Sequence, residues 1–188
     1  VGGATQLAQA LERRAKDEPE RFARLALRFD ASIPATAGAH ALRGSHAAIE
    51  LELLTELCER LSTLYGEDVG RDVCSAVESA AAVNDRLVGL VARYSESIHP
   101  DREWARTDAG SSGKYYHGGD LLSAGLNCTR GGAALAAASV LFKGADHLAA
   151  LLPVVERLAT DTTMAVRTCA AEAVLALLNH EPDAALDL

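Results

Sequence analysis

Aromatic side chains are scarce in this sequence: Phe, Trp and Tyr together make up 4% of its 188 residues. Alanine and leucine supply most of an apolar fraction of 49%, and β-branched runs with a period of two are hard to find. Small and unbranched apolar residues suit the close approach of helices, whereas strands need alternating patterns. The composition therefore favours an all-α protein with almost no strand over a β-sandwich.

Positive charge is also in deficit. Lys and Arg number 18 against 26 Asp and Glu, for a net charge of −8, which disfavours general electrostatic attachment to nucleic acid or to an anionic membrane. No apolar run approaches the roughly 20 residues that cross a bilayer. The first residues, VGGATQLAQALERR, lack the apolar segment of a signal peptide. We expect a cytoplasmic protein without membrane contact.

Clustered metal ligands are missing from the sequence as well. Its six histidines show no ligand spacing, and its cysteines include no CxxC pair. A zinc site needs such clusters, so we predict no metal and no cofactor. Buried free thiols in a reducing compartment are the expected state of the four cysteines, which are Cys58, Cys74, Cys128 and Cys169.

The stretch Leu151–Leu178 carries the clearest helical pattern. Apolar residues recur at helical spacing in both of its halves. The first stripe comprises Leu151, Leu152, Val155 and Leu158, and the second comprises Val166, Ala170, Val174, Leu177 and Leu178. Between them, Asp161, Thr162 and Thr163 can each cap a helix. Pro153 falls within the first turns, where a missing N–H costs little. The stretch predicts a helical hairpin.

The same pattern occurs earlier in the chain, because Thr129–Phe142 matches Val166–Asn179 at a constant offset of 37 residues. Self-similarity at this period is typical of a helical solenoid. Asp161 followed six positions later by Arg167, in a hairpin rich in alanine and leucine, resembles the HEAT repeat of armadillo-like proteins. The resemblance implies a right-handed α-solenoid in which Asp161, Arg167 and the equivalent Arg130 serve the turn and the neighbouring repeat rather than a ligand.

Weaker patterns predict six upstream helices, at residues 4–16, 19 onward, 34–43, 49–65, 69–83 and 84–97. The pair Arg43-Gly44 is expected to be a break or a kink, and Gly66 is expected to end the fourth of these helices. Asn84 or Asp85 is expected to cap the sixth. The expected inward stripes of these helices are Leu7, Leu11 and Ala15; Phe22, Leu25 and Phe29; Leu53, Leu57, Leu61 and Leu64; and Leu87, Leu90, Val91 and Tyr94. About nine helices result. We expect one continuous solenoid, with degenerate repeats over 1–97, a long loop over 98–119 and HEAT-like repeats over 120–188. We also expect the chain to be a piece of a longer protein.

One basic stripe, formed by Arg21, Arg24 and Arg28, lies in the second predicted helix. Residues 1–33 hold six Lys and Arg against five Asp and Glu. Because the local charge is nearly balanced, a solvated helix face explains this stripe better than a phosphate site does.

The loop predicted at 98–119 concentrates the rare aromatic residues. It is polar and rich in glycine, yet it contains Trp104, Tyr115 and Tyr116, followed by His117. A loop of this length in a compact domain is usually functional or disordered, and aromatic rings with a polar edge are frequent on partner-binding surfaces. These four residues are our candidates for partner binding. The alternative is that the rings fold back and plug the end of a helix pair.

The function that follows is a non-catalytic scaffold or sensor segment that binds a protein partner or neighbouring domains of a larger protein. The resemblance supports this function, because HEAT-type arrays mostly bind proteins and occur in large bacterial multidomain proteins, including ATPases. The alternative is a HEAT-like nucleic-acid-binding or DNA-glycosylase-type module. That alternative needs a basic groove, which this acidic sequence does not favour.

Overall fold

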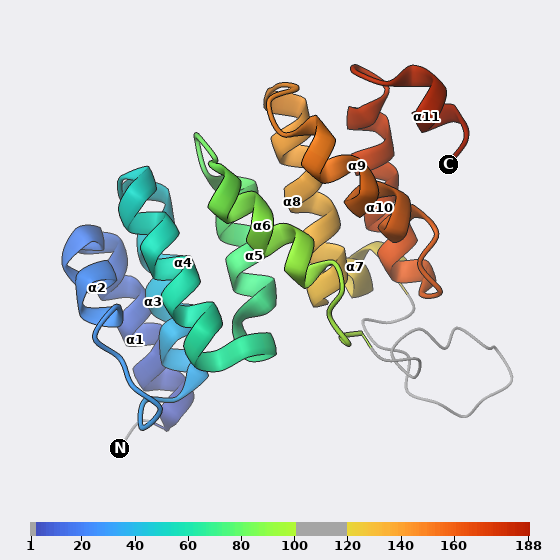
Figure 1. The fold of residues 1–188 in the computed structure, drawn as a ribbon. Helices are drawn as coiled ribbons and strands as arrows, with labels where there is room; N and C mark the ends of the chain where they lie inside the picture. The colour runs from blue at the N-terminus through green and yellow to red at the C-terminus, as the bar shows by residue number, and fades with distance from the viewer. Residues whose placement is uncertain (1–2, 101–119) are drawn as a thin grey trace, which may run out of the picture. The chain divides into compact units, whose positions relative to one another are not determined.

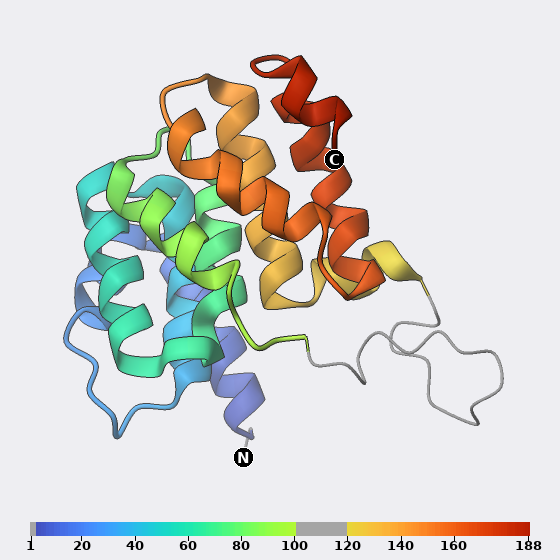
Figure 2. The same cartoon turned by 45° about the vertical axis from the view of Figure 1, so that its right-hand side comes forward.

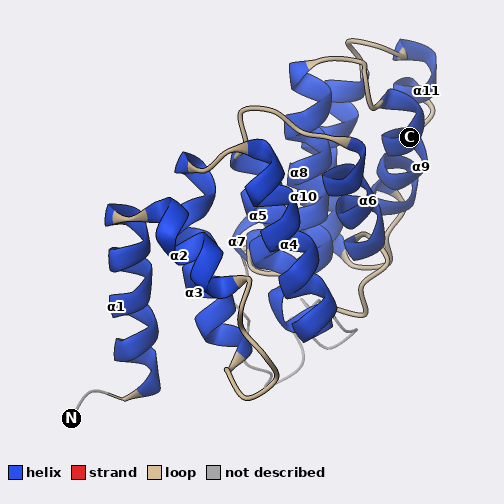
Figure 3. Ribbon diagram, turned by 60° about the vertical axis from the view of Figure 1, so that its left-hand side comes forward, coloured by secondary structure: helices blue, strands red, loops and turns tan. Residues whose placement is uncertain are grey.

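The computed structural model describes residues 3–100 and 120–188, and over these residues the chain consists of helices, turns and loops without a strand (Figure 3). The prediction of an all-α protein is thus confirmed for the described part. The chain forms two compact units, residues 1–90 and residues 91–188, and their boundary falls inside helix α6 (Asp85–Tyr94). The predicted loop residues Trp104, Tyr115, Tyr116 and His117 lie outside the described residues.

The first unit contains five helices before α6, joined in part by two short 3-10 turns at His46–Ala48 and Gly66–Val69. The helices are α1 (Ala4–Asp17), α2 (Pro19–Ala26), α3 (Ala35–Ser45), α4 (Leu51–Tyr65) and α5 (Gly70–Ser79). Figure 1 shows them in blue to green, and α3 packs against α1, α2, α4 and α5. A central α3 is possible because its inward residues are small.

Helices α4 and α6 agree well with their predictions: the four stripe residues of α6 are buried, and so are three of the four of α4. In α4, Leu53, Leu57 and Leu61 are buried, and Gly66 ends the helix with a φ of 57°, a conformation that favours glycine. Asn84 also takes its predicted place before α6, where its side-chain oxygen accepts a hydrogen bond from the N–H of Leu87 at 3.0 Å.

The inward faces predicted for α1 and α2 are wrong in part: Ala15 of α1 is buried as predicted, but the leucines do not follow the prediction. Leu7 is 74% exposed and Leu25 is 44% exposed, while Phe29 lies beyond the end of α2. Alanines occupy the buried faces instead: Ala8 and Ala15 in α1, and Ala23 and Ala26 in α2. The helices approach α3 so closely that the contact selects small side chains.

The predicted break at Arg43-Gly44 is also wrong, because α3 continues to Ser45. Gly44 lies where α3 crosses α1. A Cβ atom there would collide with the Cβ of Ala15 and would lie 2.5 Å from the backbone oxygen of Glu12. Glycine therefore permits a close crossing of two helices rather than a kink. Helix α5 ends at Ser79, four residues before the predicted Val83, because the backbone at Ala80 becomes extended.

The second unit continues with α7 (Leu121–Leu126), α8 (Thr129–Lys143), α9 (Leu148–Ala159), α10 (Met164–Leu177) and α11 (Pro182–Leu186). Helix α8 packs against α9 and α10, as the gold and orange helices of Figures 1 and 2 show. Nearly all of α8 is buried, which is typical of a central core helix. The short helices α7 and α11 add to the nine that the sequence predicts. Helix α9 begins three residues before the predicted Leu151, so Pro153 lies inside it.

Candidate functional site

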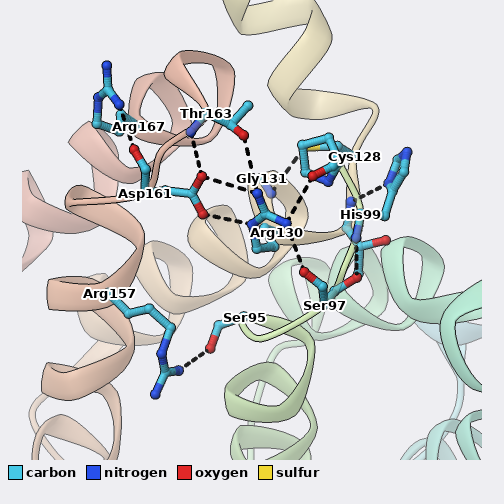
Figure 4. A network of polar contacts seen from close by, with 12 residues as sticks. Ser95, Ser97, His99, Cys128, Arg130, Gly131, Arg157, Asp161, Thr163 and Arg167 are labelled. Carbon is cyan, nitrogen blue, oxygen red and sulfur yellow. Dashed lines mark hydrogen bonds and ion pairs between the residues drawn. The ribbon is translucent and has the colours of Figure 1, made fainter. Parts of the chain in front are cut away.

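The most extensive polar network of the described residues surrounds Arg130, in the first turn of α8 (Figure 4). Its Nε donates to Oδ2 of Asp161 at 2.7 Å, and its Nη2 donates to Oδ1 of Asp161 and to Oγ1 of Thr163, both at 3.2 Å. Its Nη1 donates to the carbonyl oxygens of Ser97 at 2.8 Å and Pro100 at 3.0 Å. A guanidinium has five N–H groups, so every donor of this side chain is used.

This ion pair is shielded from solvent, because the side chains of Arg130 and Asp161 are 12% and 9% exposed. Shielding strengthens the attraction between the charges, while full hydrogen bonding compensates for the loss of water. A bidentate contact between a guanidinium and a carboxylate also fixes the relative orientation of the two side chains as well as their distance. The network therefore holds the start of α8 against the turn before α10.

Asp161 organises that turn with its backbone as well as its side chain. Its Oδ1 accepts a hydrogen bond from the N–H of Thr163 at 2.7 Å, one residue before α10 begins. Its backbone oxygen accepts one from Nη1 of Arg167, in the first turn of α10. The structure thus brings together Arg130, Asp161 and Arg167, the three residues that the sequence assigns to the repeat turn.

Residues 97–100 lie against the start of α8 through His99. The backbone oxygen of His99 accepts from the N–H of Arg130 at 3.2 Å, and its Nδ1 lies 3.3 Å from the N–H of Thr129. Cys128, before the helix, accepts from the N–H of Gly131 at 3.3 Å through its sulfur. Sequence reasoning did not select Ser97, His99 or Cys128. Only Cys128 carried a usable signal, which is its position directly before a helix.

The segment that contains the four candidate partner-binding residues starts and ends on this same unit. Pro100, at its beginning, is bonded to Arg130. Asp120, at its end, caps α7 by accepting from the N–H of Leu122 at 3.1 Å. Helix α7 packs on α10, and a Cβ at Gly125 would meet the backbone of Ala165. Both flanks of residues 101–119 are therefore anchored.

Four exposed apolar side chains occur on the segments that carry these anchors. Ile98 is 82% exposed, Leu122 47%, Leu126 43% and Met164 47%. Ile98 and Met164 are adjacent in sequence to residues of the network. Leu122 and Leu126 lie on α7, which precedes α8. We call Ile98, Leu122, Leu126 and Met164 the apolar end of the second unit. Clustered exposed apolar residues mark interaction sites more often than isolated ones do.

Other groups in the described residues are less suited to chemistry. All four cysteines are buried, as predicted, and burial raises the pKa of the Cys58 thiol to about 12 and raises that of Cys74 as well. Such thiols are weak nucleophiles at neutral pH. Within the described residues, no group of three or more His, Cys, Asp and Glu side chains could hold a metal ion.

The first unit has two further surface features, which are a small cavity and a helix face that bears arginines. A cavity of about 190 Å³ is lined by residues that include His46, Leu54 and Ser79, which is small beside common ligand pockets of roughly 300–1,000 Å³. On α2, Arg21 pairs with Glu18 at 2.7 Å and Arg24 pairs with Glu20 at 3.0 Å. These pairs are consistent with a solvated helix face.

Comparisons with protein-family models, with curated proteins and with solved structures find no match to this chain. Among the described residues, none of the helices has the length and apolar character needed to span a membrane.

Proposed function

We propose that this chain is a non-catalytic scaffold of HEAT-like helical repeats whose second unit binds a protein partner at its apolar end. The observation that carries the proposal is that Pro100 and Asp120, the described residues on either side of 101–119, are both bonded within the second unit, which also carries exposed apolar side chains. Arg130 holds the first flank through Pro100, and Asp120 holds the second through α7. The aromatic residues predicted to bind a partner are thereby tethered, at both ends, to the unit that carries Leu122 and Leu126.

The repeat assignment is supported by equivalent positions in successive hairpins. Arg130 and Arg167 are separated by the 37-residue offset and occupy the first turns of α8 and α10. Both bond to Asp161, one through its carboxylate and the other through its backbone oxygen. The ion pair therefore joins one hairpin to the next, a role that suits a stacking contact. Its full set of hydrogen bonds leaves Arg130 no free donor for a ligand.

Protein binding is favoured over nucleic-acid binding by the charge of the second unit. Residues 91–188 contain 8 Lys and Arg against 12 Asp and Glu, a net charge of −4. A nucleic-acid-binding or DNA-glycosylase-type module, the alternative, would present positive charge to phosphates. Exposed apolar side chains such as Leu122 and Leu126 are instead suited to a protein whose contact surface is also apolar.

The test compares three immobilised forms of the 188-residue chain in lysate of the source cell. These are the natural sequence, the double variant Leu122→Glu and Leu126→Glu, and the control Leu7→Glu, which alters a leucine of α1 that is 74% exposed. We expect a protein that the natural sequence and the control retain and that the double variant loses by at least about tenfold. Equal retention by all three forms, with equal circular dichroism, would contradict the proposal.

The aromatic residues are tested in the same assay. Replacing Trp104, Tyr115 and Tyr116 with alanine should reduce partner retention as strongly as the glutamates do, without lowering the melting temperature. A clear drop in melting temperature would instead indicate that the rings plug the end of a helix pair and serve the fold.

A further inference from the structure

Helix α10 exposes an apolar stripe that is separate from the apolar end. Ala171, Leu175 and Leu178 follow one another at spacings of four and three, so they share one face of the helix. Leu175 is 57% exposed and Leu178 is 38% exposed. Helix α11 packs against α10 through the buried Ala185 and adds Leu186, which is 76% exposed.

Acidic side chains border the C-terminal part of this stripe, and the nearest Lys or Arg in the chain is Arg167, four residues before Ala171. Residues 168–188 contain four acidic residues and neither Lys nor Arg. All four are exposed, and among the described residues none of them forms an ion pair; Glu172, Glu181 and Asp183 lie nearest the stripe in the chain. We define the acidic face as the three leucines Leu175, Leu178 and Leu186 together with Glu172, Glu181 and Asp183. A complementary surface has to be basic and partly apolar.

The first unit carries a surface of that kind on α2. Arg21, Arg24 and Arg28 recur at spacings of three and four, and all three are exposed. Leu25, 44% exposed, lies among them, and together the four residues line one shallow depression. We call them the arginine face. The partners of Arg21 and Arg24 are exposed glutamates of the same helix, and exposed pairs of this type exchange readily.

We infer that the acidic face of one molecule binds the arginine face of a second molecule of the same chain. The two faces are opposite in charge, and each contains exposed leucine. Because they are different surfaces, the contact is heterologous, and it leads to open chains or rings rather than to a closed two-fold dimer. The inference is independent of partner binding at the apolar end, since it uses other residues.

The contact is small and therefore weak. Helix α2 has 8 residues, a length of about 12 Å, so its exposed side buries less than the roughly 800 Å² per partner of a stable interface. The charges are exposed, so salt weakens the contact. We expect association in the range of about 10 μM to 1 mM at low salt, and a dissociation constant at least tenfold higher when salt shortens the Debye length from about 30 Å to about 3 Å.

Sedimentation equilibrium of the 188-residue chain tests the inference with two complementary variants. Leu175→Lys puts a positive charge into the middle of the acidic face and keeps the arginine face, whereas the double variant Arg24→Glu and Arg28→Glu disrupts the arginine face and keeps the acidic face. Each variant alone should stay monomeric at concentrations where the natural sequence associates. Mixed in equal amounts, they should form a dimer that does not grow further, because only one productive pair of faces remains.

Leu178→Lys replaces the first variant if Leu175→Lys fails to fold by circular dichroism, and Leu7→Glu is the control that should associate like the natural sequence. A natural sequence that remains monomeric up to about 1 mM would overturn the inference. So would variants that associate on their own, or a mixture of the two variants that remains monomeric. None of these results bears on retention of a partner at the apolar end.

Discussion

Replacing Arg130 with methionine should destabilise the second unit strongly, because the side chain of Arg130 neutralises a carboxylate that is almost buried. Methionine has a similar length and supplies no donor. The variant removes both bonds to Asp161 and the bonds to the carbonyl oxygens of Ser97 and Pro100. The carboxylate of Asp161, 9% exposed, keeps the N–H of Thr163 as a donor and loses its counter-charge.

Breaking a buried ion pair by removal of one partner costs about 3–5 kcal/mol. This cost is a large part of the roughly 5–15 kcal/mol by which a protein of this kind is stable. At about 2–4 °C per kcal/mol for a chain of this size, the melting temperature should fall by roughly 6–20 °C. Denaturant unfolding followed by circular dichroism measures the free energy, and calorimetry measures the melting temperature.

Three comparisons separate the loss of the pair from a general effect of substitution. Asp161→Asn keeps the shape and gives Arg130 an amide oxygen, so it should cost less than the methionine variant. The double variant Arg130→Met with Asp161→Leu leaves no unpaired carboxylate and should recover part of the loss. Arg86→Met removes three hydrogen bonds to Glu52 and Glu59, but those side chains are well exposed, so no measurable loss is expected. An Arg130→Met variant within about 1 kcal/mol of the natural sequence would refute the reasoning, because a neutral substitution is typical of exposed pairs.

Further predictions concern the close helix crossing, one carboxylate and the thiols. Gly44→Ala should lower the free energy of unfolding by about 1–3 kcal/mol, because its methyl group would collide with α1. Gly89→Ala, where nothing lies near the added atom, should be neutral or stabilising. Equal effects of the two variants in denaturant unfolding would contradict a close contact between α1 and α3 at Gly44. The pKa of Glu12 is lowered by hydrogen bonds from Lys16 and then from His40, so Glu12 stabilises the fold above its ordinary pKa of about 4.5 and loses that contribution as pH falls through the lowered value. Glu12→Gln should therefore be less stable than the natural sequence at pH 7, and the difference should shrink as the pH falls from about 4.5 through the lowered pKa; a difference that does not shrink on acidification would argue against the ionised carboxylate as the cause. A thiol reagent at pH 8 should leave all four cysteines unmodified in the native protein and react with four per chain after unfolding; reaction of the native protein would show that a thiol is accessible.

The sequence predicted helices better than it predicted their buried faces. A leucine stripe at helical spacing located α4, and Gly66 marked its end, because a large apolar face leaves few alternatives. In α1 the pattern favoured Leu7 together with Ala15, yet Leu7 is exposed while Ala8 and Ala15 are buried. Where helices cross closely, the smallest side chains face the neighbour, and periodicity gives large and small apolar residues the same weight. Gly44, interpreted as a break, belongs to the same class of contact.

The candidate site was predictable where it is local in sequence or repeated. Asp161 and Arg167 are six positions apart, and the 37-residue offset added Arg130. Ser97 and His99 could not be selected in this way, because they meet Arg130 across about 30 residues through backbone oxygens. Every residue has a backbone carbonyl oxygen, so the residue type does not indicate which of them accepts a hydrogen bond. Such contacts can be identified only in the folded structure.

Site-specific photocrosslinking tests the central claim most directly, since it records contact at a chosen residue. A photoreactive amino acid in place of Leu126 should crosslink to a single major protein in source cells, whereas the same group at Leu7 should not. A Leu126 probe that yields no protein adduct beyond those of the Leu7 probe, or that crosslinks to nucleic acid, would contradict protein binding at the apolar end.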